Sequence, residues 1–161
     1  MEPLEPPALH QAQAAYGWLE LGNVEEAFAE LQRLPEELQS LPAVQAVRLD
    51  CLMAAKDWNA AVKLAQVLCG QWAEEPGLWL HHAYAARRCA GGSIEAAYEL
   101  LAPCVERFPE EWLIPYNVAC YLCQMERLDE AQAMLEMARS KGGERVDAMA
   151  KDDEDLAPLN L

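Results

Sequence analysis

The chain has 161 residues, of which 53% are hydrophobic and 24% are charged, and this composition excludes a disordered, collagen-like or low-complexity protein. Asp and Glu number 27 against 12 Lys and Arg, so the formal net charge is -15. A field of this sign repels nucleic acid and anionic membranes and attracts cationic groups. We therefore expect no nucleic-acid partner and no membrane partner, and the charge favours a protein or peptide partner of basic character.

The start of the chain lacks the positive charges and the apolar stretch of a signal peptide, and no apolar run reaches the roughly 18 residues that a membrane helix needs. These absences predict a cytoplasmic protein. Six cysteines in a chain without an export signal predict reduced thiols rather than a disulfide framework. Residues 1–7 contain three prolines and show no periodicity, so we expect a loose lead-in there.

A repeated pattern follows, in which a short loop precedes an apolar residue, two mostly polar residues and an alanine that opens a helix-like stretch. The alanines are 34, 36 and 34 residues apart: Ala27, Ala61, Ala97 and Ala131. Helical periodicity on both sides of each alanine predicts a helical hairpin. The predicted hairpins span about residues 8–41, 42–75, 76–109 and 110–141.

The joints between the predicted helices carry residues that begin and end helices. Asn23, Asp57 and Ser93 have side chains that serve as N-caps, and Gly22, Gly91 and Gly92 suit helix ends. Apolar residues at helical spacing after each alanine are expected to face the interior: Leu31 and Leu34, Ala65 and Leu68, Leu101 and Cys104, Leu135 and Ala138.

Two stretches are expected to depart from the hairpin pattern. Pro35 ends the second helix of the first unit and leaves Glu36 to Ser40 as an extra turn. Residues 142–161 are expected to form a capping helix, from about Glu144 to Lys151, followed by a tail. The acidic run from Asp152 to Asp155 lacks the alternating ligands and the glycine turn of a calcium loop, so we expect a solvated terminus.

A helical hairpin repeated about every 34 residues, with small residues where helices cross, resembles the tetratricopeptide repeat. The best match is the run from Tyr116 to Leu122, with Ala119 at the small-residue position. The second unit departs from the pattern, with Leu49 at that position and Lys56 in place of the turn glycine. The chain as a whole resembles the small stand-alone tetratricopeptide proteins of bacteria. The resemblance implies an all-α fold, an α-solenoid of about four helix-turn-helix hairpins plus a C-terminal capping helix, as a single domain over residues 1–161.

The resemblance also implies a non-catalytic protein–protein interaction module that binds a peptide or helix of a partner in a concave groove lined by the first helices. Tyr16, Glu20, Asp50 and Met53 are expected on this face in the first two units. The partner-binding residues are expected in the last two units: Tyr84, Arg87, Arg88, Tyr116, Asn117, Cys120 and Gln124. The two arginines either clamp a carboxylate of the partner or pair with nearby acids such as Glu95 and Glu99, and the sequence leaves both open.

Other functions remain as alternatives. Small, acidic, three-repeat chaperones of type III secretion cargo have a similar length and pI. A thiol redox or metal-binding protein would use Cys120 and Cys123, which lie on one side of a helix. Their mid-helix position and the lack of a second Cys or His pair nearby favour packing instead.

Catalytic motifs are missing from the sequence. It contains no Gly-rich phosphate loop, no Gly-x-Ser-x-Gly and no His-Glu-x-x-His, so we expect no enzyme, no catalytic residue, no cofactor and no metal. The oligomeric state is left open, since an open solenoid end with exposed apolar residues often self-associates.

Overall fold

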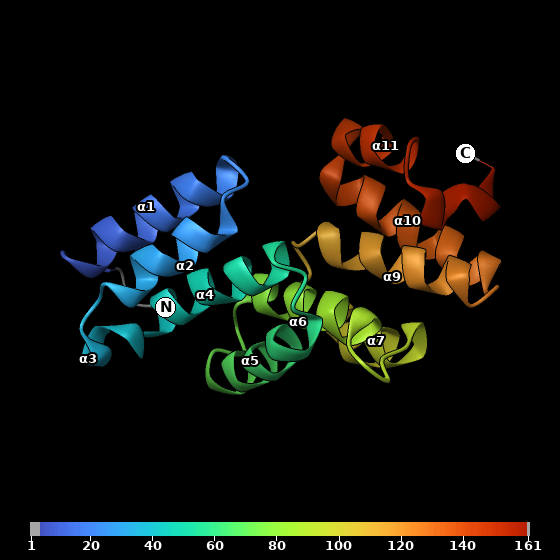
Figure 1. Cartoon of the computed structure of the whole chain (residues 1–161). Helices are drawn as coiled ribbons and strands as arrows, with labels where there is room; N and C mark the ends of the chain where they lie inside the picture. The colour runs from blue at the N-terminus through green and yellow to red at the C-terminus, as the bar shows by residue number, and fades with distance from the viewer. Residues whose placement is uncertain (1–3, 161) are drawn as a thin grey trace. The chain divides into compact units, whose positions relative to one another are not determined.

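A computed structural model describes residues 4–160, and all regular secondary structure in that range is helical, which confirms the all-α prediction (Figure 1). In chain order the elements are α1 (Ala8–Glu20), α2 (Val24–Gln32), α3 (Glu36–Gln39), α4 (Pro42–Ala54), α5 (Trp58–Gln71), α6 (Pro76–Arg88), α7 (Ile94–Leu101), α8 (Cys104–Arg107), α9 (Leu113–Gln124), α10 (Leu128–Gly142), α11 (Glu144–Ala150) and the 3-10 helix η1 (Glu154–Leu159). None of the described helices is long and apolar enough to cross a membrane.

The predicted N-caps are confirmed. The Asn23 side chain accepts a hydrogen bond from the backbone N–H of Glu26 at 3.2 Å. Asp57 and Ser93 make the same bond, each at 3.1 Å, to the residue three positions later. Each cap occupies an N–H group that the first turn of a helix leaves unpaired, so α2, α5 and α7 begin one residue after it.

A left-handed residue follows each of the helices α1, α4, α6 and α9. The φ angles are 74° at Gly22, 57° at Lys56, 75° at Gly91 and 60° at Glu126. In three hairpins the next residue then donates its N–H to the carbonyl five residues earlier, as in a Schellman motif: Asn23 to Trp18, Asp57 to Leu52 and Arg127 to Leu122. The same turn therefore recurs in these three hairpins, although only one of their three left-handed residues is a glycine.

The predicted interior positions are confirmed. Ala27, Ala61, Ala97 and Ala131 all have an exposed fraction of 0%. The eight apolar residues that follow them at helical spacing, from Leu31 to Ala138, are no more than 4% exposed. Leu49 is also fully buried at the position where the repeat usually has a small residue.

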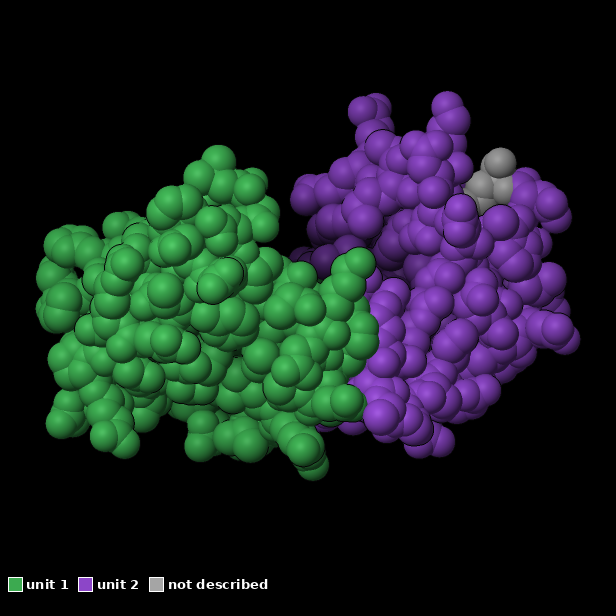
Figure 2. All heavy atoms as spheres, viewed as in Figure 1, with its two compact units in different colours: residues 1–81 green, residues 82–161 purple. Residues whose placement is uncertain are grey.

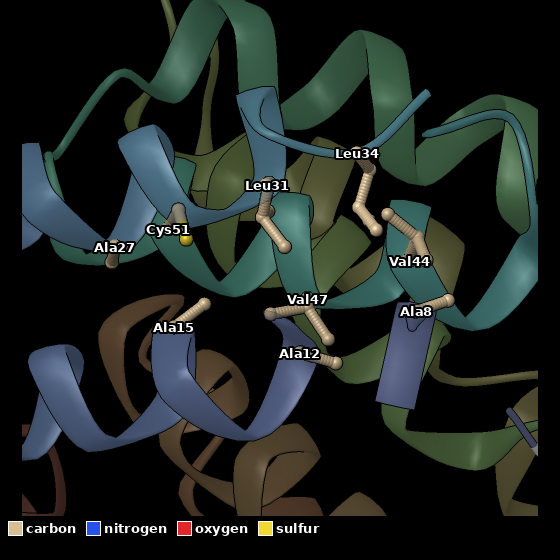
Figure 3. Close-up of a cluster of buried hydrophobic side chains, with 9 residues drawn as sticks. All are labelled: Ala8, Ala12, Ala15, Ala27, Leu31, Leu34, Val44, Val47 and Cys51. Atoms are coloured by element: carbon tan, nitrogen blue, oxygen red, sulfur yellow. The ribbon is translucent and has the colours of Figure 1, made fainter. Parts of the chain in front are cut away.

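The chain divides into two compact units, residues 1–81 and 82–161, with the division inside α6 (Figure 2). In the first unit α1 packs against α2, α4 packs against α5, and both helices of the first pair contact α4. Alanines of α1, Ala27 and Leu31 of α2, and Val44 and Val47 of α4 meet in one apolar cluster (Figure 3). The prediction of a single domain over the whole chain stays a prediction.

In the second unit, α9 packs against α10, and α7 and α8 pack on α9. A helix at the predicted place after Gly143 is confirmed, because α11 spans Glu144–Ala150, and it packs against α10. The extra turn after Pro35 is confirmed in the first unit as α3. Residues 1–3 of the predicted lead-in lie outside the described residues, and Leu4 packs against the apolar cluster of the first unit.

The prediction of a solvated terminus at Asp152 to Asp155 is wrong. The chain turns back after α11, and η1 packs against α9 and α10 (Figure 1). Asp153 caps η1 by accepting a hydrogen bond from the Asp155 N–H at 3.0 Å, and Leu156 is 0% exposed. A buried leucine directly after the acidic run explains why this run is docked rather than free.

Candidate functional site

Four of the predicted partner-binding residues converge on one stretch of the chain, residues 152–156, which we call the acidic segment. Arg87 comes from the last turn of α6, and Tyr116, Cys120 and Gln124 lie at four-residue intervals along α9. Such spacing places side chains on one face of a helix. This face of α9 is the one against which the acidic segment lies.

Asp153 is held through its carboxylate. The Tyr116 hydroxyl donates a hydrogen bond to Oδ2 at 2.7 Å, and the Cys120 thiol donates to the same oxygen at an Sγ–O distance of 3.6 Å. The other carboxylate oxygen, Oδ1, accepts the N–H of Asp155. All three donors are neutral, so Asp153 is recognised as a hydrogen-bond acceptor.

Asp155 is held by charge. The Arg87 guanidinium donates through Nη2 to Oδ1 at 3.0 Å and through Nη1 to Oδ2, which is the two-pronged arrangement of arginine with carboxylate. The hydrogen bond to Asp155 raises the pKa of Arg87 further above its usual range. The Gln124 amide donates to the main-chain carbonyl of Asp155 at 3.2 Å. The site therefore contacts both the side chain and the backbone of the acidic segment.

This docking covers residues that the sequence placed on an open groove. Tyr116 is 3% exposed and Cys120 is 4% exposed. Burial is the main cause that raises the pKa of both groups, and the neighbouring Asp153 raises it further. Both groups are consequently held in their protonated, donating form.

The other three predicted residues have contacts outside the acidic segment. Asn117 donates its amide to the Leu113 carbonyl of its own helix at 2.8 Å. The Arg88 guanidinium carbon lies 3.5 Å from the centroid of the Tyr84 ring, a cation–π contact at the end of α6. Of the two alternatives for the arginines, pairing with an acid holds for Arg87, but the acid is Asp155 rather than Glu95 or Glu99.

The first unit contains a second set of polar contacts, which joins α1, α4 and α6. The hydroxyl of Tyr16 in α1 donates to Asp50 Oδ2 in α4 at 2.8 Å, and His81 Nε2 in α6 lies 3.6 Å from Asp50 Oδ1. The structure thus brings Tyr16 and Asp50 together, as expected for one face. Burial raises the pKa of Asp50, while His81 and the Tyr16 hydroxyl act in the opposite direction.

The two thiols of α9 are held in their protonated, unreactive form. Cys120 and Cys123 are both buried, and burial raises the pKa of both, with Asp153 and Asp155 adding to it. A redox thiol or a metal ligand needs a lowered pKa, because the thiolate is the reactive form. Within residues 4–160, no three His, Cys, Asp or Glu side chains are placed to hold a metal ion.

A cavity of about 490 Å³ lies elsewhere in the second unit. Val118 and Leu122 of α9 and Met134 and Met137 of α10 contribute to its wall. None of the predicted partner-binding residues lines it. The cavity is mainly apolar and has no set of converging hydrogen-bond donors comparable to that around Asp153 and Asp155.

Sequence reasoning missed the acidic segment as the neighbour of the predicted residues. Two signals could have found it. Leu156 is an apolar residue directly after a charge run, and the arginines of α6 stand out in a chain with few cations.

A scan against models of known protein families finds no match to this chain, and no curated protein matches it at a significant level.

Proposed function

We propose that the protein is a tetratricopeptide-like α-solenoid that acts as a non-catalytic binding module for a polypeptide segment of a partner protein. The recurring left-handed turn and the four buried alanines support the repeat. In the first unit, the contact of α1 and α2 with α4 is the stacking that such a repeat requires. The α11 helix serves as the cap of the last hairpin.

One observation carries the binding function. Arg87, Tyr116, Cys120 and Gln124, chosen from the sequence as contacts for a peptide, hold a piece of polypeptide. Their donors reach two carboxylates and one main-chain carbonyl, which are groups that a partner segment also presents. A surface that binds this segment within the chain has the chemistry to bind a similar segment of another protein.

The electrostatics of the site support binding rather than catalysis. A general base or a nucleophile needs a pKa near the working pH, or one lowered toward it. The pKa values of Tyr116 and Cys120 are instead raised, mainly by burial. These groups therefore serve as stable hydrogen-bond donors.

Selection from a random peptide library on the full chain tests this function. We expect enriched peptides to bind the wild-type chain, and to bind D153N/D155N, in which docking of the acidic segment is weakened, more tightly. Adding Arg87→Gln to D153N/D155N should weaken the binding at least tenfold. The matched control is Arg139→Gln, which also breaks an ion pair of the second unit, that of Arg139 with Asp147 at 2.7 Å. Enrichment of no peptide, or equal binding by the Arg87 and Arg139 variants, would overturn the proposal.

A further inference from the structure

We propose that the surface of α6 and α9 recognises an acidic segment of a partner, with two carboxylates two residues apart followed by leucine, and that residues 152–156 occupy this surface until such a partner displaces them. This inference rests on the proposed function and names the partner's chemistry. It reverses the expectation from net charge, which favoured a basic partner.

The first argument is the charge of Arg87. Its side chain is only 19% exposed, and both of its Nη groups donate to the Asp155 carboxylate. Removing the carboxylate from a partly buried ion pair leaves an uncompensated charge in a poorly solvated place. An occupant that replaces the acidic segment must therefore supply its own carboxylate at this position.

The second argument is the set of neutral donors. The Tyr116 hydroxyl and the Cys120 thiol both point at one oxygen of Asp153. A lysine or arginine in the place of Asp153 offers only hydrogen-bond donors, so it cannot accept the bonds from the hydroxyl and the thiol. A carboxylate accepts both. The two carboxylate positions of the site are thus separated by one residue, as Asp153 and Asp155 are.

The third argument is that the bound shape is local. Asp153 caps the N–H of Asp155, a turn that a short peptide of the same sequence can form without the rest of the chain. The Gln124 amide donates to the main-chain carbonyl of Asp155, and this hydrogen bond does not depend on the residue type at that position. Leu156 adds an apolar anchor that is buried completely.

The fourth argument is that the acidic segment can detach. It follows α11 through Lys151 and Asp152, which are exposed, and the Asp155 side chain retains 28% exposure. A tether this short holds the segment at an effective concentration on the order of 1 mM. A partner segment with similar contacts therefore binds the intact chain weakly and binds a chain with a released segment strongly.

Fluorescence anisotropy with a labelled peptide that copies residues 151–160 tests the proposal. The receptor is the full chain, either wild type or carrying D153N/D155N/L156A, which we call the released variant. We expect the released variant to bind the peptide at least tenfold more tightly than the wild-type chain. Adding Arg87→Gln to the released variant should remove this gain, and adding Arg139→Gln should leave it in place.

A second peptide, with asparagine in place of both aspartates, measures the requirement for carboxylates. We expect it to bind the released variant at least tenfold more weakly than the acidic peptide. If loss of Leu156 unfolds the chain, as judged by circular dichroism, D153N/D155N with Leu156 intact should show the same order of affinities. Equal binding by the wild-type chain and the released variant, or by the two peptides, would overturn the proposal.

A third peptide, with lysine at both positions, separates this inference from the proposed function. If it binds better than the acidic peptide, or if the library selection yields Arg87-dependent peptides while the acidic peptide fails, only the inference is overturned. If neither the library nor any of the three peptides gives binding, the proposed function fails as well. A wild-type dimer that becomes monomeric in the released variant would identify a second copy as the occupant, which also overturns the inference.

Discussion

Two buried tyrosines of α9 differ in a single hydrogen bond. The Tyr116 hydroxyl donates to Asp153 at 2.7 Å. The Tyr121 hydroxyl is buried and has no hydrogen-bond partner among residues 4–160, and burial raises its pKa to about 12. A buried polar group without a partner lowers the free energy of unfolding, because the folded state loses the bond to water and gains nothing for it.

We therefore expect Tyr121→Phe to raise the free energy of unfolding by about 1 kcal/mol, because phenylalanine keeps the ring and removes the unpaired hydroxyl. Tyr116→Phe, the matched variant on the same helix, should lower it by about 1 kcal/mol. Urea unfolding followed by circular dichroism measures both. A loss of stability in Tyr121→Phe would show that its hydroxyl is satisfied in solution.

Asp50 gives the first unit a pH-dependent contact. Burial raises its pKa, against the effects of His81 and the Tyr16 hydroxyl. A carboxyl whose pKa is higher in the folded state stabilises the fold while it is protonated, and this contribution is lost as the pH rises through the folded-state pKa. At neutral pH, ionised Asp50 therefore lowers stability.

We therefore expect Asp50→Asn to have a higher melting temperature than the wild-type chain at pH 7, because the amide still accepts the hydrogen bond from Tyr16 and carries no charge. The difference should shrink toward zero near pH 3.5, where the carboxyl is protonated. Tyr16→Phe should show the opposite effect, a loss that is larger at pH 7. Melting curves at both pH values decide this, and an Asp50→Asn advantage that grows on acidification would contradict the assignment.

At the scale of the elements, the turns after α4 and α9 require a left-handed backbone conformation at a residue that is not glycine. Lys56 and Glu126 adopt φ angles of 57° and 60°, where the Cβ of an ordinary residue crowds the following carbonyl. Gly22 occupies the corresponding place in the first hairpin without that cost.

Lys56→Gly and Glu126→Gly should each raise the free energy of unfolding by about 1 kcal/mol, because glycine adopts the left-handed region freely. Lys63→Gly, in the interior of α5, is the control and should lower it by about 1 kcal/mol. Chemical denaturation of the three variants gives the comparison. Destabilisation by both turn substitutions would mean that these side chains contribute contacts that outweigh the strain.

Docking of the acidic segment can be followed through the thiol that it covers. Cys120 is 4% exposed beneath Asp153, and Cys104 is also buried, at the start of α8, where its thiol donates to the Leu100 carbonyl. We expect iodoacetamide at pH 8 to modify Cys120 faster in D153N/D155N than in the wild-type chain, because local opening becomes more frequent. Removing the Asp153 charge also lowers the pKa of the thiol.

Mass spectrometry of the modified peptides gives the rate at each cysteine. The rate at Cys104 should stay the same in both chains. A parallel rise at both cysteines would indicate global loosening, and an unchanged Cys120 rate would mean that the two carboxylates do not hold the segment in place.

The hairpin elements were predictable because their signals are local. Asn23 caps a helix that starts at the next residue, and Ala27 is buried by a pattern that repeats along the chain. The acidic segment was not predictable in this way. Its main contact joins Arg87 to Asp155, which are 68 residues apart, and a run of acids by itself is typical of a solvated tail. Only the three-dimensional structure shows that the burial of Leu156 and the ion pair with Arg87 stabilise the docked segment more than hydration of its acidic side chains favours the free one.

For the whole molecule, the site and the overall charge oppose each other. The chain carries a net charge of -15, while the candidate site uses one of only 12 basic residues to hold a carboxylate. The long-range field repels an acidic segment, and the local guanidinium attracts it. These two effects have different ranges, since salt screens exposed charges beyond about 8 Å at physiological ionic strength and screens a partly buried pair much less.

Added salt should therefore speed the association of an acidic partner, although an ion pair forms in the complex. Between 20 and 150 mM NaCl, we expect the association rate of the acidic peptide with the released variant to rise severalfold, because screening removes the long-range repulsion. The dissociation rate should change little, because the contact with Arg87 is local and partly desolvated. The peptide with lysine at both aspartate positions should associate faster than the acidic peptide at low salt, and this advantage should narrow as salt is added. Stopped-flow anisotropy measures these rates, and an association rate for the acidic peptide that falls with salt would mean that it binds at a cationic surface larger than the one around Arg87.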